Sequence, residues 1–212
     1  MEVKGKKEQI LEAAMSLILT KGYSHTSVED ITNSIGIAKG SFYTYFKSKN
    51  LLLRTIIEEQ ITSSLVQQEK QLSEGNSFDE ILFKNIVSRV KFFDEDLRRQ
   101  LVLINLARNI DVLGKEVRDL MIKIEAINYN FIKNLLKKYN FELKLEAAEI
   151  EQYSQIINSI IRGFKMANVF FDDNSKDNFF IKDINEAKKR IDHKKFDEGI
   201  EFIYKSILKM LK

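Results

Sequence analysis

Proline is absent from all 212 residues of this chain, and only eight glycines occur in it. These two residue types are the ones that most often end or kink a helix, so nothing forces the long periodic segments to break. Apolar residues recur through most of the chain at the three- and four-residue spacing of an amphipathic helix. The sequence therefore predicts an all-α fold, long enough for one small and one larger domain.

Residues 26–49 have the pattern of two short helices joined by a glycine turn. The first helix has one apolar stripe, and either Thr26 or Ser27 stands before it, where a hydroxyl can cap the first backbone amides. Gly36 follows the stripe and can adopt the left-handed conformation that ends a helix. The stripe consists of Val28, Ile31 and Ile35.

The second helix is predicted over residues 39–46 and places Phe42 and Phe46 one turn apart, so both rings are expected to pack inward. Its other face offers a cation, hydroxyl groups and a glycine, which suits contacts with phosphates and base edges. That face consists of Lys39, Gly40, Ser41, Tyr43, Thr44 and Tyr45. The alternative, core aromatics beside a solvated basic face, does not explain why the glycine turn and the two helices occur together.

Positive charge is concentrated at the N-terminal end. Residues 1–54 contain eight Lys and Arg against five Asp and Glu, whereas residues 55–212 contain 26 of each. No acidic residue occurs between Asp30 and Glu58. The whole net charge of +3 therefore lies in the first quarter of the chain, which marks that end as the one that faces a polyanion.

Taken together, these positions resemble the DNA-binding signature of the TetR (tetracycline repressor) family of bacterial transcriptional regulators. The resemblance covers about residues 8–54 and rests on three runs, Thr26–Ile31, Gly36–Phe46 and Lys47–Lys49. It implies a three-helix DNA-binding domain with a helix-turn-helix, here residues 1–54, and a helical effector-binding and dimerisation domain, here residues 55–212. It also implies a repressor that leaves a palindromic operator when a small molecule binds.

The resemblance further assigns contacts to double-stranded DNA, residue by residue. The base-edge contacts of the family fall on Lys39, Gly40 and Tyr43. Its phosphate contacts fall on Thr26 or Ser27, Ser41, Tyr45 and Lys49. Phe42 stands where members of the family usually have leucine, and a core position tolerates that exchange.

Beyond residue 54 the apolar periodicity predicts a series of long helices, and Ser48 and Ser77 can cap the first two. Asp94–Asp96 is expected to break the helical series. A polar loop is predicted over residues 172–195, with a short helix near residues 184–190 as an alternative and Phe179–Phe180 as a pocket cover or docking anchor. The helices are expected over residues 48–73, 78–93, 97–110, 115–139, 144–171 and 196–211.

A small hydrophobic effector is expected between the long helices, where apolar walls meet a few polar groups. Asn158 and Arg162 lie one turn apart and could hold an anionic or carbonyl group. An internal hydrogen-bonding network or a contact between subunits is the alternative. The candidates are Asn105, Arg108, Asn128, Tyr129, Tyr153, Asn158 and Arg162.

Small residues suggest a close approach of two helices. Gly163 and Ala167 lie one turn apart, and Gly199 lies near the start of the last helix. We expect both helices, with Ile203 and Ile207, to pair with their copies in a homodimer, although packing within one chain is the alternative. A dimer also suits DNA, because two reading helices must reach major grooves about 34–36 Å apart.

Other classes of protein find little support in the sequence. It contains no phosphate-binding glycine loop, no histidine-based triad and no metal-ligand spacing, so we expect no enzyme, no cofactor and no metal. The absence of cysteine fits a cytoplasmic protein, and no segment approaches the roughly 20 apolar residues that cross a bilayer. The remaining alternative is a DNA-architectural or replication-linked protein on the same scaffold, without an effector.

Overall fold

The computed structural model describes residues 5–75, 77–91, 97–170, 184–185, 188 and 193–211. Every regular element in these ranges is a helix, so the predicted all-α fold is confirmed. The chain forms two compact units, each built from separate segments. Unit 1 comprises Met1–Ile61, Phe92–Ile122 and Phe180–Ala187, and unit 2 comprises Thr62–Lys91, Lys123–Phe179 and Lys188–Lys212. The predicted functional boundary at residue 54 stays a prediction.

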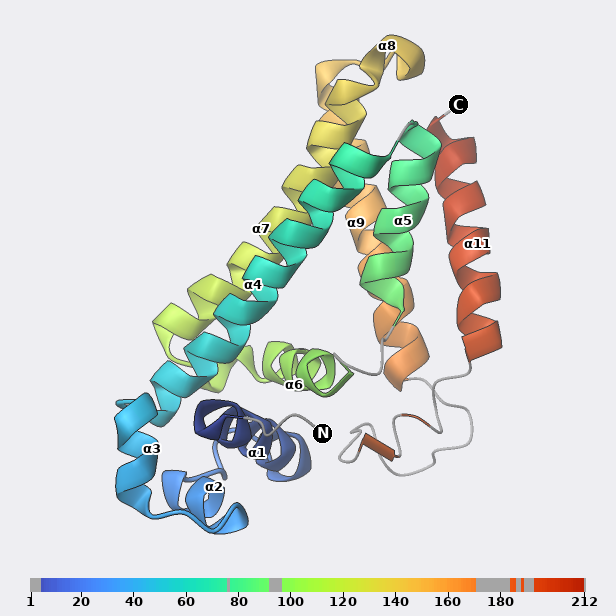
Figure 1. The fold of residues 1–212 in the computed structure, drawn as a ribbon. Coiled ribbons are helices and arrows are strands. Elements are labelled where there is room, and N and C mark those ends of the chain that lie inside the picture. Colours follow the sequence, from blue (N-terminus) through green and yellow to red (C-terminus); the bar gives the residue numbers. More distant parts are fainter. Residues whose placement is uncertain are drawn as a thin grey trace. The chain divides into compact units, whose positions relative to one another are not determined.

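Unit 1 begins with three helices, of which the third starts at Lys39 as predicted and ends one residue earlier, at Tyr45. α1 packs against α2, and α2 packs against α3 (Figure 1). α6 lies along α1 and completes the apolar core of the unit, in which Ile10, Ile31 and Phe42 are fully buried. The elements are α1 (Lys6–Lys21), α2 (Val28–Ser34), α3 (Lys39–Tyr45), the first part of α4 (Lys49–Glu74), α6 (Leu97–Arg108), η1 (Ile110–Val112) and the first part of α7 (Lys115–Lys138).

Ion pairs connect α6 to its neighbours in unit 1. Arg98 pairs with Glu12 on α1, and Arg99 Nη2 lies 3.0 Å from Glu59 Oε2 on α4. These side chains are partly exposed, so each pair contributes at most about 1 kcal/mol to stability. The buried side chain of Val102 and its apolar neighbours on α6 contribute more through hydrophobic packing.

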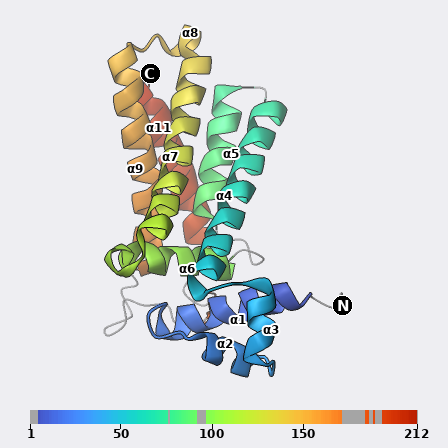
Figure 2. The same ribbon diagram turned by 90° about the vertical axis from the view of Figure 1, so that its left-hand side faces the viewer.

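Unit 2 is a bundle of long helices. Figure 2 shows these helices running side by side along the bundle. α5 packs against both α9 and α11, which also pack against each other. Ile86 on α5, Leu135 on α7 (Lys115–Lys138) and Ile157 on α9 are fully buried. The elements are the rest of α4 and α7, α5 (Phe78–Val90), α8 (Asn140–Leu143), α9 (Ala147–Phe170) and α11 (His193–Leu211).

The helix predicted from residue 144 begins at Ala147 instead, because a separate turn of helix, α8, precedes it. Lys144 adopts a left-handed φ of 55° and ends α8. The Asn140 side chain holds the following bend, since its Oδ1 accepts from Leu145 N at 2.8 Å and its Nδ2 donates to Leu145 O at 3.0 Å. Periodicity alone does not reveal such a bend.

A polar network lies buried between α4 and α5. Asn85 is 1% exposed, and its Nδ2 donates to Gln71 Oε1 at 3.3 Å. Gln71 Nε2 in turn donates to Ser88 Oγ at 3.0 Å. The Asn85 Oδ1 atom is buried without a hydrogen-bond partner. Amide side chains therefore join α4 to α5 by hydrogen bonds.

Two predicted caps are confirmed, because Ser48 Oγ accepts from Leu51 N and Ser77 Oγ accepts from Glu80 N. Other expectations fall on parts of the chain that are not described. Asp94–Asp96 and Phe179–Phe180 lie outside the described residues. In the predicted loop of residues 172–195, the described residues 184–185, 188 and 193–195 are helical.

Candidate nucleic-acid interface

The start of α2 is fixed by a reciprocal capping box between Ser27 and Asp30. Ser27 Oγ accepts from Asp30 N at 3.0 Å, while Ser27 N donates to Asp30 Oδ2 at 2.7 Å. Lys21 Nζ lies 2.8 Å from the same carboxylate oxygen. Lys21 and Ser27 hold the pKa of the Asp30 carboxyl well below its usual range. Of the two predicted caps, Ser27 is the one that the structure uses.

The turn between α2 and α3 depends on Gly36, whose φ of 65° lies in the left-handed region. The turn directs Phe42 and Phe46 inward, and both rings are buried, with centroids 5.7 Å apart. The two rings anchor one side of α3, which leaves its opposite side toward solvent.

The exposed side of α3 displays residues that were predicted to contact DNA. Lys39 and Gly40 are exposed, and Tyr43 and Tyr45 are 49% and 42% exposed. Ser41 is half-buried. A Cβ added at Gly40 would meet no heavy atom within 4 Å, so this end of α3 is open to a close approach by another molecule. Their contact with DNA stays a prediction.

Thr26 and Lys49 have other surroundings than the resemblance implied. Thr26 is 1% exposed, and its Oγ1 donates to Gly22 O at 2.8 Å, so its side chain is not open to a phosphate. Lys49 Nζ donates to Tyr23 O at 2.9 Å and to Thr26 O at 2.7 Å. Burial lowers the pKa of Lys49, and the nearby Asp30 carboxylate opposes this effect. Both side chains therefore hold the loop between α1 and α2.

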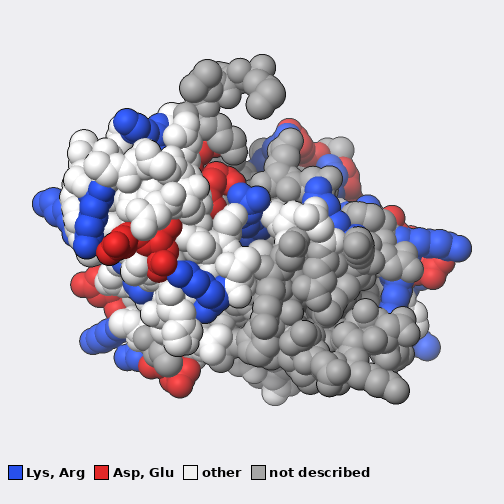
Figure 3. Space-filling view, turned by 90° about the horizontal axis from the view of Figure 1, so that it is seen from below, with Lys and Arg blue, Asp and Glu red and all other residues white. Residues whose placement is uncertain are grey.

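The charge on this part of the molecule is mixed. The face seen in Figure 3 shows Lys and Arg side chains together with acidic ones, rather than a uniformly basic surface. Glu29 is exposed beside the start of α2, and Lys39, Lys47 and Ser48 are exposed along and after α3. The positive balance of residues 1–54 is therefore spread between cations that face solvent and cations, such as Lys49, that bind within the unit.

The predicted effector residues do not gather in one place. Asn105 lines a cavity of unit 1, whereas the side chain of Arg108 lies outside the described part of the chain. Asn128 Oδ1 accepts from Gln68 Nε2 at 3.2 Å in unit 2. Burial raises the pKa of Tyr129, with a hydrogen bond to the Glu151 carboxylate as a further cause. Tyr153 is half-buried on α9.

Asn158 and Arg162, one turn apart on α9, differ in surroundings. Asn158 is buried, and its Oδ1 accepts from Arg89 Nη1 at 2.6 Å. The Arg162 side chain is 59% exposed, and its Nη1 lies 3.8 Å from Glu125 Oε2. The predicted pair therefore does not form one binding group. Burial lowers the pKa of Arg89 to about 10. Sequence reasoning did not predict the role of Arg89, because its partner Asn158 is 69 residues away.

The predicted dimer residues fall into two groups. Ile203 and Ile207 are buried within the chain, whereas a contact of this helix with a second subunit stays a prediction. A Cβ added at Gly199 would come within 2.2 Å of Phe164 Cζ, so this glycine permits close packing of α11 against α9 inside one chain. Gly163 is exposed with open space around it, and Ala167 is half-buried.

The capped α2, the turn at Gly36 and the exposed polar side of α3 have the geometry of a helix-turn-helix. Residues 10–56 match the family model described as bacterial regulatory proteins, tetR family. These residues carry the N-terminal DNA-binding domain of the TetR family of transcriptional regulators. Within the described residues, no helix is long and apolar enough to cross a membrane.

Similar proteins extend the likeness beyond the first three helices. The HTH-type transcriptional regulator YerO of Bacillus subtilis is 27% identical over 169 residues, which are 78% of this chain and 56% of YerO. The matched part is thus only about half of YerO. The biofilm operon icaADBC HTH-type negative transcriptional regulator IcaR of Staphylococcus epidermidis is 26% identical over 137 residues, 63% of this chain and 69% of IcaR.

A solved structure shares the fold over nearly the whole length. The crystal structure of a TetR transcriptional regulator from Legionella pneumophila aligns with a TM-score of 0.66 at 18% identity, and the alignment covers 97% of this chain and 99% of that one. The helical fold of that structure is therefore shared by both units of this chain.

Proposed function

We propose that this chain is a homodimeric repressor that occupies a palindromic operator and leaves it when a small molecule binds. The observation behind this proposal is the open, polar side of α3, where Lys39, Gly40 and Tyr43 face solvent while Phe42 and Phe46 anchor the helix. The description of the similar protein IcaR as a negative regulator supports repression over activation.

Exposed apolar side chains on α9 and α11 support the dimer. Phe202 on α11 is 73% exposed and Ile156 on α9 is 42% exposed, although both helices bury other faces within the chain. Large apolar side chains on adjacent helices are what a second copy can cover. Gly163 on α9 is exposed, and a Cβ added there would meet no heavy atom within 4 Å, which leaves room for a close approach.

Selection from a random pool of DNA duplexes, with the purified protein at near-physiological salt, tests the DNA-binding part. Recovery of one palindrome with half-sites about one helical turn apart is expected from a dimer. Recovery of no motif, together with affinity that simply collapses as salt rises, would instead favour the architectural alternative.

Two matched variants test the dimer by analytical ultracentrifugation. Phe202→Lys places a charge on α11, whereas Phe141→Lys does the same at a side chain of almost equal exposure, 74%, on α8. We expect Phe202→Lys to yield monomers and to lose operator binding, and Phe141→Lys to remain dimeric. A dimer that survives both changes would mean that subunits meet elsewhere.

A further inference from the structure

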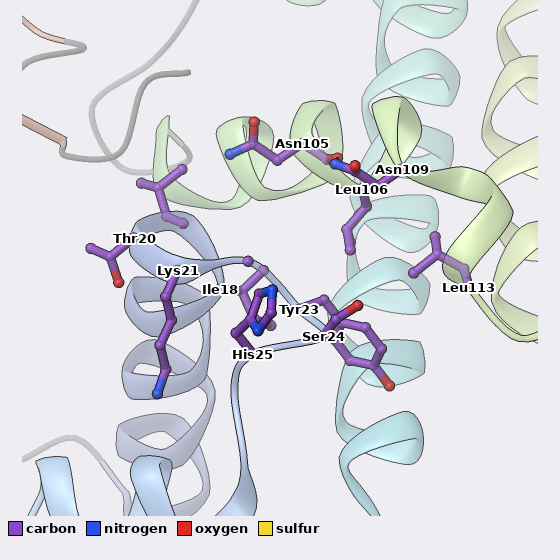
Figure 4. A pocket seen from close by; sticks show the side chains of 12 residues that line it. Ile18, Thr20, Lys21, Tyr23, Ser24, His25, Asn105, Leu106, Asn109 and Leu113 are labelled. Carbon is purple, nitrogen blue, oxygen red and sulfur yellow. The ribbon is translucent and has the colours of Figure 1, made fainter. Parts of the chain in front are cut away.

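Unit 1 contains a cavity of about 570 Å³ between the C-terminal end of α1, the loop that leads to α2, and α6. Figure 4 shows Leu106 pointing from α6 toward the loop that contains Tyr23, Ser24 and His25. The cavity volume falls within the range of about 300–1,000 Å³ that is usual for small-molecule sites. Of the predicted effector residues, Asn105 lines this cavity, whereas Asn128, Tyr129, Tyr153, Asn158 and Arg162 belong to unit 2.

The cavity lining has the composition of a ligand site. Ile18, Leu19, Leu106 and Leu113 supply apolar walls. Polar groups from two sides complete it, with Tyr23 and His25 on the loop and Asn105 and Asn109 on α6. Apolar walls with a few polar groups can bury a ring or short chain and orient one hydrogen-bonding group.

The charges around the cavity favour an uncharged ligand. The described residues that line it include no carboxylate, so a cation would lose its hydration without an acidic partner. Lys21 lines the cavity, and its ammonium lies 2.8 Å from the Asp30 carboxylate. An anion would therefore have to compete with Asp30 for that ammonium.

We infer that this cavity is the effector site, and that it takes a small neutral molecule with an apolar ring or chain and one amide-like or hydroxyl group. The inference rests on the proposed function, because only a regulator released by a ligand needs an effector. Asn105, predicted as an effector residue, supplies the amide on α6, and Tyr23 supplies the opposite wall.

The position of the cavity also explains how binding would reach DNA. Residues 22–25 of the loop form one wall, and Lys49 holds the loop through the carbonyls of Tyr23 and Thr26. The next residue, Ser27, caps α2. A ligand that displaces Tyr23 therefore moves the start of α2 and, through the turn at Gly36, the exposed face of α3. Release follows if the ligand binds the displaced state more tightly than the DNA-binding state.

Three probes of matched shape test the ligand class by nuclear magnetic resonance on the full-length protein. Benzamide is neutral, benzoate is anionic and benzylamine is cationic. We expect benzamide to produce saturable shifts in the amides of residues 18–25 and 105–113, with a dissociation constant on the order of millimolar for so small a molecule. The two charged probes should bind at least about tenfold more weakly, because each leaves a charge uncompensated.

A pair of variants identifies the site. Asn105→Leu removes the amide from the α6 wall, and Asn134→Leu makes the same change at an exposed position of α7 in unit 2. The first should weaken benzamide binding about tenfold or more, since a hydrogen bond to the ligand is lost, while the second leaves it unchanged. Circular dichroism and thermal melting check that both variants fold.

Other outcomes overturn the inference. Shifts in the amides of α5, α7 and α9 would mean that the effector binds elsewhere. Equal effects of the two variants, or no saturable shift, would mean that this cavity does not bind the probe. The DNA selection reports on the proposed function separately. If the protein selects no operator, that function fails, whereas if it selects one and benzamide binds at residues 18–25 without lowering operator affinity, only the inference fails.

Discussion

The Lys49 ammonium lies 4.2 Å from the centre of the Tyr23 ring and donates a hydrogen bond of 2.9 Å to the Tyr23 carbonyl. Together with the bond to Thr26 O, this contact closes the loop between α1 and α2 against the start of α4. The side chain is therefore engaged inside unit 1, where it fixes the position of α2.

We expect Lys49→Ala to lower the free energy of unfolding by about 1–3 kcal/mol, because two carbonyls lose a charged donor. Lys47→Ala is the matched control, since Lys47 is exposed two residues earlier. It should leave the melting temperature unchanged and lower the salt dependence of DNA binding. If Lys49→Ala instead kept full stability and only weakened the salt dependence, its role would be a phosphate contact.

Replacement of Lys39 tests the reading face of α3. Lys39→Ala should relax the sequence preference at one position of each half-site, at a cost of about 1–3 kcal/mol for the preferred base. Selection of bound DNA with the variant, compared with selection by the natural chain, should show which base pair of the half-site the variant no longer distinguishes. A uniform loss of affinity for all sequences, like that of Lys47→Ala, would contradict a base contact.

Asp30→Asn tests the cap of α2 and its dependence on pH. Lys21 and Ser27 lower the pKa of Asp30, so the ionised carboxylate stabilises the folded state. This stabilisation is complete above the ordinary aspartate pKa of about 4 and is lost as pH falls through the lowered value. The melting temperature of the variant should therefore lie below that of the natural chain at pH 7, and the two should converge toward pH 2.

Lys165 in unit 2 should make stability rise with pH. Burial lowers its pKa to about 7, with the Arg89 guanidinium as a further cause and the Glu125 carboxylate opposing it. Between pH 7 and about 10 the unfolded chain holds more protons at this lysine, so the free energy of unfolding increases with pH. Lys165→Met should flatten this rise in urea denaturation, whereas the exposed Lys205→Met keeps it. Parallel curves for all three proteins would refute the assignment.

Two glycines of unit 2 should respond oppositely to alanine. Gly199→Ala places a Cβ into the Phe164 ring and should cost about 1–3 kcal/mol, whereas Gly163→Ala meets open space and should gain about 0.5–1 kcal/mol of helix stability. Gly163→Ala should nevertheless weaken the dimer if this face meets its copy. Denaturation and sedimentation measured on the same samples separate the two effects, and a dimer of unchanged affinity would exclude Gly163 from the interface.

Local patterns in the sequence were sufficient for much of the fold. The hydroxyl before α2, the glycine at position 36 and the spacing of Phe42 and Phe46 act within a few residues, so their roles follow from short-range rules. The same holds for the cap at Ser77. These features give the helix bounds and the inward and outward faces of α3.

Short-range rules could not predict contacts between residues that lie far apart in the sequence. Lys49 binds a carbonyl 26 residues away, and Arg89 binds Asn158 across 69 residues. The orientation of Ile203 and Ile207 depends on which side of α11 meets α5 and α9, and an apolar stripe does not distinguish a core from a subunit interface. The cavity beside Asn105 arises from the packing of α6 on α1, which no single segment encodes.

The amide network between α4 and α5 has a further consequence. If α4 slid by one helical turn along α5, Gln71 would leave Asn85 and Ser88, and each buried polar group left without a partner would cost about 1–3 kcal/mol. Apolar side chains tolerate such a shift far better, because their attraction has no direction. The network therefore fixes the register of α4 against α5. Pairings shifted by one turn are disfavoured even where they bury as much apolar surface.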